Sequence, residues 1–153
     1  MTRFPTLKPR AALPAAAVAQ VNYYNTVCGL PAFLRAGSGL IFVAAGSIGA
    51  IVVPVPLAPK LTRRLKLSVP TIINLAAGHR TTWTFLTAPI PTHVRHSVPT
   101  TTVLDRCGAT MVAEGAEILL PSPDDPARRW HAAAPTDRYR PSPVSILAAL
   151  AAR

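Results

Sequence analysis

The sequence predicts a single α+β domain, built on a mainly antiparallel sheet with two to four short helices. Its 153 residues suffice for one domain that buries roughly two thirds of its unfolded surface, and half of them are hydrophobic. Seventeen prolines and eight glycines predict short elements joined by many turns. Helical and strand patterns alternate irregularly around hairpin signals, which is typical of the α+β class. We assign residues 13–153 to the domain and expect residues 1–12 to form a disordered or extended arm.

A first helix is expected over residues 14–28. The stretch "PAAAVAQVNYYNTVC" places Val18, Val21 and Tyr24 on one helical face. Gly29 stands where a C-terminal cap belongs, because glycine adopts the left-handed conformation without strain.

A small antiparallel meander is expected over residues 31–54. The runs "PAFLR" and "LIFVAA" flank Gly-Ser-Gly, and "IGAIVVP" follows Gly46 and Ser47. Glycine in a short loop is what a type II′ hairpin turn requires. Residues 36–59 are uncharged and long enough to cross a membrane, but their glycines, prolines and β-branched residues favour strands. We therefore expect no membrane span.

An amphipathic helix is predicted for "LAPKLTRRLK", residues 57–66. Leu57, Leu61 and Leu65 recur with helical spacing and should face the core. The opposite face carries the cations Lys60, Arg63, Arg64 and Lys66.

The middle of the chain reads as two strands followed by a loop and a helix. The strands are expected at residues 69–75 and 81–89, and a proline-rich loop at residues 89–100. A short helix should then cover residues 100–107 and end at Gly108.

The last part of the chain predicts three more strands and a closing helix. Strands are expected at residues 109–115 and 117–123, and an edge strand at residues 128–135. Ser142 is a good N-cap and Pro143 suits the first helical position, so a helix should begin there.

The charges are distributed unevenly along the chain. Residues 1–104 contain no Asp or Glu. They carry ten cations: Arg3, Lys8, Arg10, Arg35, Lys60, Arg63, Arg64, Lys66, Arg80 and Arg95. The six acids come later: Asp105, Glu114, Glu117, Asp124, Asp125 and Asp137. Such a basic surface attracts a polyanion such as nucleic acid, or an acidic protein surface.

The cysteines and the amino-terminal residues predict free thiols and no signal peptide. Cys28 and Cys107 are too few and too far apart for a zinc signature or a disulfide framework, so we expect free thiols. The first twenty residues contain no continuous, strongly apolar stretch before a cleavage site, and we interpret them as not a signal peptide.

No catalytic site is predicted from the sequence. Two-metal nucleotide transfer needs clustered carboxylates, yet none occurs before residue 105, and Asp124 and Asp125 lie in an apparent loop. His93 and His96 could face one another only on a helix, which the neighbouring prolines oppose, and no third metal ligand is in view. Neither a phosphate-binding loop nor a nucleophile with a partner acid is recognisable. We therefore expect no catalytic residue, no metal and no cofactor.

The positive candidates are cations and aromatic residues. We expect nucleic-acid contacts, mainly to phosphates, from Lys60, Arg63, Arg64, Lys66, Arg80 and Arg95. Trp83 and Phe85 alternate along one strand, so they share a face. They form either a base-stacking platform or, as we favour, part of the core, and Trp130 poses the same choice.

The second half of the chain resembles a known family. The segments "TTWTFLTAP", "GATMVAEGAEILLPSP", "RRW" and "YRPSPVSILAALA" are similar, in order and spacing, to small actinobacterial proteins related to the amino-terminal primase/polymerase (Prim-Pol) region. Some short members carry the label DNA-directed RNA polymerase subunit beta. The resemblance covers roughly residues 75–150 and implies part of a primase-like α+β fold in a cytoplasmic protein. The family's metal-binding Asp-x-Asp and its histidine motif have no matching positions here, so the resemblance implies no activity.

Three hypotheses follow. The leading one is a non-catalytic Prim-Pol-like domain that binds nucleic acid or a nucleotide through its basic surface. The second is a protein-interaction module that docks on an acidic surface of RNA polymerase or of the replication machinery. The third is a residual nucleotidyltransferase, which would depend on Asp124 and Asp125.

Overall fold

A computed structural model describes residues 15–75 and 80–152, and the expected arm at residues 1–12 lies outside this part. The described chain forms one α+β domain, which confirms the predicted class, but its strands form two antiparallel sheets and not one. The helices are α1 (Ala15–Thr26), α2 (Leu57–Arg64), α3 (Thr92–Arg95), α4 (Val98–Cys107) and α5 (Pro143–Ala151). The strands are β1 (Phe33–Leu34), β2 (Ile41–Ala44), β3 (Gly49–Pro54), β4 (Thr71–Asn74), β5 (Thr82–Thr87), β6 (Thr110–Met111), β7 (Glu117–Leu120) and β8 (Arg128–Trp130).

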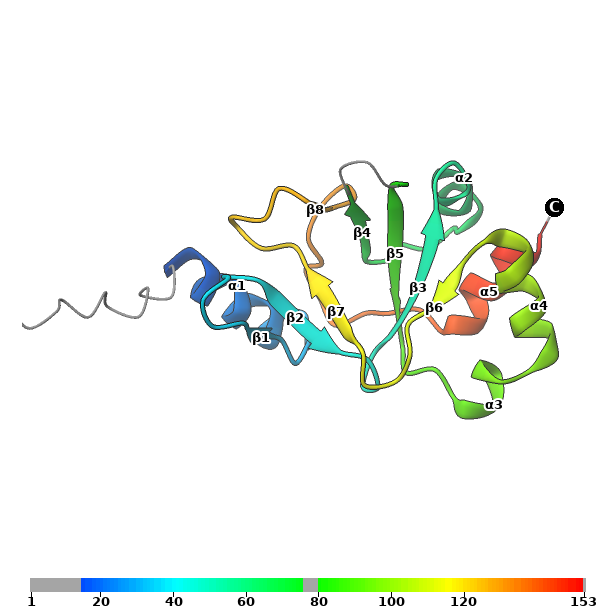
Figure 1. Ribbon diagram of the computed structural model, residues 1–153, viewed down its shortest axis with the longest axis horizontal. Helices are drawn as coiled ribbons and strands as arrows, with labels where there is room; N and C mark the ends of the chain where they lie inside the picture. Colours follow the sequence, from blue (N-terminus) through cyan, green and yellow to red (C-terminus); the bar gives the residue numbers. More distant parts are fainter. Residues whose placement is uncertain (1–14, 76–79, 153) are drawn as a thin grey trace, which may run out of the picture.

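The elements form three layers (Figure 1). A five-stranded sheet, in the order β6-β3-β5-β4-β8, lies in the middle. Helices α2, α4 and α5 cover one of its faces, where Ile51 and Phe85 meet Leu61 and Ile146. Helix α1 and the three-stranded sheet β1-β2-β7 cover the other face.

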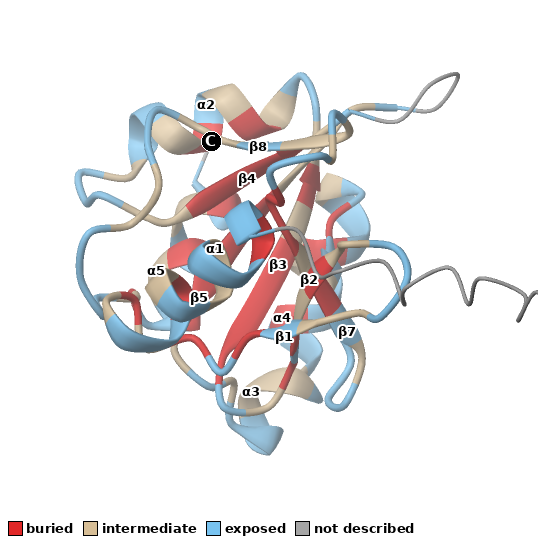
Figure 2. Ribbon diagram, turned by 90° about the vertical axis from the view of Figure 1, so that its left-hand side faces the viewer, coloured by how far each residue is buried: buried red, intermediate tan, exposed pale blue. Residues whose placement is uncertain are grey.

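The central strands are buried on both faces because each face has a covering layer (Figure 2). In β5, Thr84 and Leu86 point to one side and Phe85 and Thr87 to the other, and all four are buried. Strand β3 is a nearly continuous apolar run and is also mostly buried. Burial in these two strands therefore does not alternate as it would in a half-exposed strand.

The expected meander over residues 31–54 is wrong at its third strand. Strands β1 and β2 do pair, but β3 pairs with β5 and β6 in the other sheet. The chain passes from one sheet to the other at Gly46, whose φ of 143° is a backbone conformation that glycine adopts without strain. The uniform apolarity of β3 suits the doubly covered sheet better than an outer hairpin.

The expected loop at residues 89–100 contains helix. Helix α3 forms one turn there, which makes five helices in the described chain instead of the expected maximum of four. Helix α4 begins at Val98, where Ser97 Oγ accepts a hydrogen bond from Thr100 N at 3.3 Å. Pro99 is tolerated because it lies in the first turn of α4, where a backbone N–H would have no acceptor within the helix.

The end of α4 and the start of α5 follow their predicted signals. Gly108 is the left-handed C-cap of α4 with φ of 64°, whereas Gly29, with φ of 62°, lies three residues past the end of α1 at Thr26. Ser142 Oγ accepts from Val144 N at the start of α5. Within residues 15–75 and 80–152, no helix is both long and apolar enough to cross a membrane.

Candidate nucleic-acid interface

Helix α2 separates an apolar face from a basic one. Ala58 and Leu61 are buried against β3 and α5, while Leu57 and Leu65 are partly buried, which confirms the predicted inward face. The cations on the outer side are all exposed: Lys60, Arg63, Arg64 and, just past the helix, Lys66.

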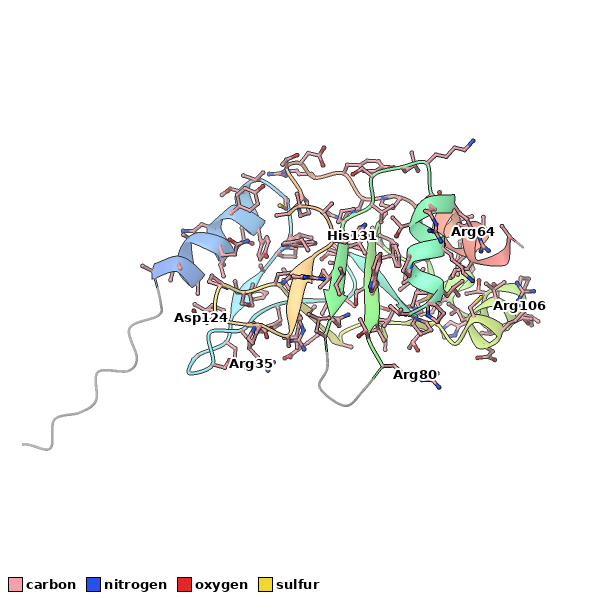
Figure 3. All side chains as sticks on the ribbon, turned by 90° about the horizontal axis from the view of Figure 1, so that it is seen from above. Arg35, Arg64, Arg80, Arg106, Asp124 and His131 are labelled. Atoms are coloured by element: carbon pink, nitrogen blue, oxygen red, sulfur yellow. The ribbon has the colours of Figure 1, made fainter. Side chains whose placement is uncertain are left out.

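Arg106 of α4 extends this basic surface. Arg64 and Arg106 border an open hollow of about 420 Å³, whose floor includes Leu57, Cys107 and Leu150. Arg64 Nη1 also donates to Ala149 O at 3.2 Å, near the carboxyl end of α5, where a cation is favourable. Figure 3 shows Arg64 and Arg106 at the same end of the molecule. We call Lys60, Arg63, Arg64, Lys66 and Arg106 the basic helix face.

No carboxylate pairs with the basic helix face within the described part of the chain. The ion pairs there are Arg35 with Glu117 and Arg128 with Asp125. Asp105 lies on α4 but borders a different hollow, together with Arg95 and Glu114. The positive field of the basic helix face is therefore largely uncompensated.

Two of the six predicted contact residues do not join this surface. Arg80 is exposed just before β5, and Figure 3 places it apart from Arg64 and Arg106. Arg95 is half-buried on α3, and its Nη1 donates to Val112 O at 2.8 Å. Arg95 therefore connects α3 to the segment after β6.

The aromatic candidates serve mainly as core. Phe85 is completely buried because both faces of β5 are covered, which agrees with the favoured core role and leaves no ring face for stacking. Trp130 packs edge-on against Tyr24 with 5.9 Å between ring centroids, and its Nε1 donates to Tyr24 Oη at 3.1 Å. Trp83 is half-buried and lies against the His131 ring, with centroids 4.5 Å apart.

A cleft of about 430 Å³ lies beside α2 and was not predicted from the sequence. Thr62 contributes from α2 and Leu65 from just past its end, and the segment after β8 contributes His131, Asp137 and Tyr139. The cleft forms because β8 pairs with β4 and brings residues 131–139 next to residues 65–71. Local sequence patterns do not reveal such a long-range pairing.

The carboxylates are dispersed. Asp125 Oδ2 accepts from Arg128 Nη1 at 2.7 Å and Oδ1 accepts from Ala127 N, so this side chain holds the turn before β8. Asp124 is exposed beside it. Within residues 15–75 and 80–152, no three His, Cys, Asp or Glu side chains gather as a metal site would require. The geometry therefore gives no support to Asp124 and Asp125 as metal ligands.

Both cysteines are free thiols, as expected. Cys28 is buried, and burial raises the pKa of its thiol more than the nearby Arg140 lowers it. Cys107 is partly exposed in the hollow of the basic helix face.

Comparisons with protein-family models, with curated proteins and with solved structures gave no match to this chain.

Proposed function

We propose that this protein binds nucleic acid through the basic helix face. The observation that carries the proposal is the group of exposed cations on α2, extended by Arg106 and without a carboxylate partner in the described chain. Lys and Arg side chains on one exposed helical face contact phosphates and release counterions, which gives salt-dependent binding with little sequence preference.

The cleft beside α2 suits an unpaired base or a nucleotide. Its volume of about 430 Å³ is within the range of small-ligand sites. The His131 ring, backed by Trp83, offers an aromatic surface, and Asp137 offers a hydrogen-bond acceptor. Lys66 follows Leu65 at the border of the cleft, where a phosphate attached to the base would find a cation.

This role agrees with the resemblance to Prim-Pol-like proteins. We also propose that the chain is related to that family, on the basis of the similarity over roughly residues 75–150. A cytoplasmic location, where nucleic acid is accessible, is part of the same proposal. The proposal concerns binding and assigns no catalytic residue.

The test compares two variants of equal net charge. The first replaces three cations of the basic helix face: Lys60→Gln, Arg63→Gln and Arg64→Gln. The control replaces three exposed arginines elsewhere: Arg80→Gln, Arg129→Gln and Arg138→Gln. Fluorescence anisotropy with labelled single- and double-stranded DNA at low salt measures the affinity, and thermal unfolding verifies that both variants fold.

We expect the first variant to lose about tenfold or more in affinity, because three phosphate contacts disappear. The control should lose at most a few-fold, since only the long-range field changes. Equal losses in both variants would show that no local site exists, and absent binding by the unmodified protein would refute the proposal. A protein partner recovered after nuclease treatment, with no affinity for DNA, would favour the protein-interaction module instead.

A further inference from the structure

The outer face of the three-stranded sheet presents two phenylalanine rings. The register aligns Phe33, Phe42 and Leu119 in one row across β1, β2 and β7. The ring centroids of Phe33 and Phe42 are 5.8 Å apart, with 33° between the ring planes. Phe33 is 57% exposed, and Phe42 and Leu119 are partly exposed. These rings thus face solvent, while Ile41 and Val43 on the inner face are buried.

Arg35 lies over one of these rings. Its guanidinium carbon is 5.2 Å from the centroid of Phe42, and the group pairs with Glu117. Arg35 comes directly after β1, whose Leu34 pairs with Ile41 at one end of β2. Glu117 pairs with Ala44 at the other end of β2. The arginine side chain therefore spans Phe42 to reach its partner. Both side chains are still about half accessible, at 41% and 47%.

We infer that Phe33, Phe42 and Arg35 form a surface that stacks the bases of single-stranded nucleic acid. Every base has a π face, so aromatic rings on neighbouring strands of an exposed sheet bind successive bases with little sequence preference. The guanidinium of Arg35 adds a planar surface that is also cationic. The inference depends on the proposed function, because it concerns the same class of ligand.

The size of the patch favours bases over a protein partner. Even a fully exposed aromatic side chain offers only about 150–250 Å². The row contains three partly exposed apolar side chains, whereas a stable protein interface needs about 800 Å² from each partner. Single bases, in contrast, need one ring each. The net charge of +10 also favours a polyanionic ligand.

Arg35 is placed to exchange its partner on binding. A phosphate beside a stacked base would compete with the Glu117 carboxylate for the same guanidinium. Removing the carboxylate should therefore strengthen binding, because Arg35 would no longer have to leave an ion pair. Removing any surface carboxylate also raises the net charge, so a purely structural role of this pair predicts only a small gain that is equal for the single strand and the duplex.

The stacking surface and the basic helix face lie at opposite ends of the molecule (Figure 1). Variants at one surface leave the contacts of the other intact. The two proposals can therefore fail separately.

The experiment measures binding of a labelled 20-nucleotide thymidine strand and of a 20-base-pair duplex by anisotropy. Phe33→Leu keeps an apolar side chain but removes the ring, so we expect roughly a fivefold or larger loss for the single strand and none for the duplex. Phe33→Trp should retain or increase single-strand affinity. Glu117→Gln should tighten binding of the single strand.

An unchanged single-strand affinity in Phe33→Leu, with the basic helix face still required, would overturn this inference alone. An equal loss on the duplex would also overturn it, since paired bases cannot stack on the rings. Sedimentation showing that Phe33→Leu dissociates a dimer would assign the surface to a second copy of the chain. No binding of either DNA by the unmodified protein would instead refute the proposed function.

Discussion

At the scale of single residues, Tyr24 connects the first helix to the sheets. Its Oη donates to Pro121 O at 2.6 Å and accepts from Trp130 Nε1 at 3.1 Å. The residue is completely buried, and burial raises the pKa of its phenol. The sequence predicted Tyr24 on the inward face of a helix. It could not predict the hydrogen bonds, because their partners lie 97 and 106 residues away.

We predict that Tyr24→Phe lowers the free energy of unfolding by about 1–3 kcal/mol, because Trp130 Nε1 loses its acceptor. The raised pKa means that the folded state retains the phenolic proton more tightly than the unfolded state. Stability should therefore fall as the pH rises above the ordinary tyrosine pKa of 10.0. This part of the fall should be missing in Tyr24→Phe.

Urea unfolding of the two proteins at pH 8, 10 and 11 measures this effect. Tyr139→Phe is the control, since Tyr139 is exposed. An identical loss of stability in Tyr24→Phe and in the unmodified protein would contradict the assignment.

At the scale of elements, α2 shows what local pattern predicts well. Three leucines at helical spacing identified its inward face, and the cations between them identified the outward one. The same kind of local reasoning located α1, the end of α4 at Gly108 and the start of α5 at Ser142, but it placed the start of α4 in a loop. It missed α3, which is a single turn between prolines and has no apolar periodicity to reveal it.

We predict a large loss of stability for one substitution in α2 and almost none for a substitution at the neighbouring residue. Leu61→Ala should lower the free energy of unfolding by about 2–5 kcal/mol, because Leu61 is completely buried between α2 and the sheet. Lys60→Ala should change it by no more than about 0.5 kcal/mol, because its side chain is exposed. Denaturant unfolding with circular dichroism measures both. A large cost for Lys60→Ala would mean that the basic helix face is packed against something.

At the scale of the whole molecule, the division into two sheets is what local pattern could not supply. Consecutive strands β2 and β3 enter different sheets, as do β6 and β7. Hairpin signals rank neighbouring strands as partners, but β3 pairs with β5 and β6, which lie far along the chain. The cleft beside α2 depends on the pairing of β8 with β4, and the addition of Arg106 depends on the packing of α4 near α2, so neither was predicted.

The two cysteines provide an internal test of where nucleic acid binds. Cys107 lies in the hollow of the basic helix face, whereas Cys28 is buried in the opposite half of the core. Bound DNA should therefore slow alkylation of Cys107 by iodoacetamide severalfold, while Cys28 should react slowly with or without DNA. Mass spectrometry of the native protein measures both rates. An unprotected Cys107 under saturating DNA would place the binding site elsewhere.

The most direct test of the central claim is the salt dependence of DNA binding. If three to five cations of the basic helix face contact phosphates, the logarithm of the binding constant for a single strand should fall linearly with the logarithm of salt concentration, with a slope of roughly −2 to −4. Replacing Lys60, Arg63 and Arg64 by Gln should make that slope shallower by about 2. A flat dependence, or a slope unchanged by these three substitutions, would contradict the account.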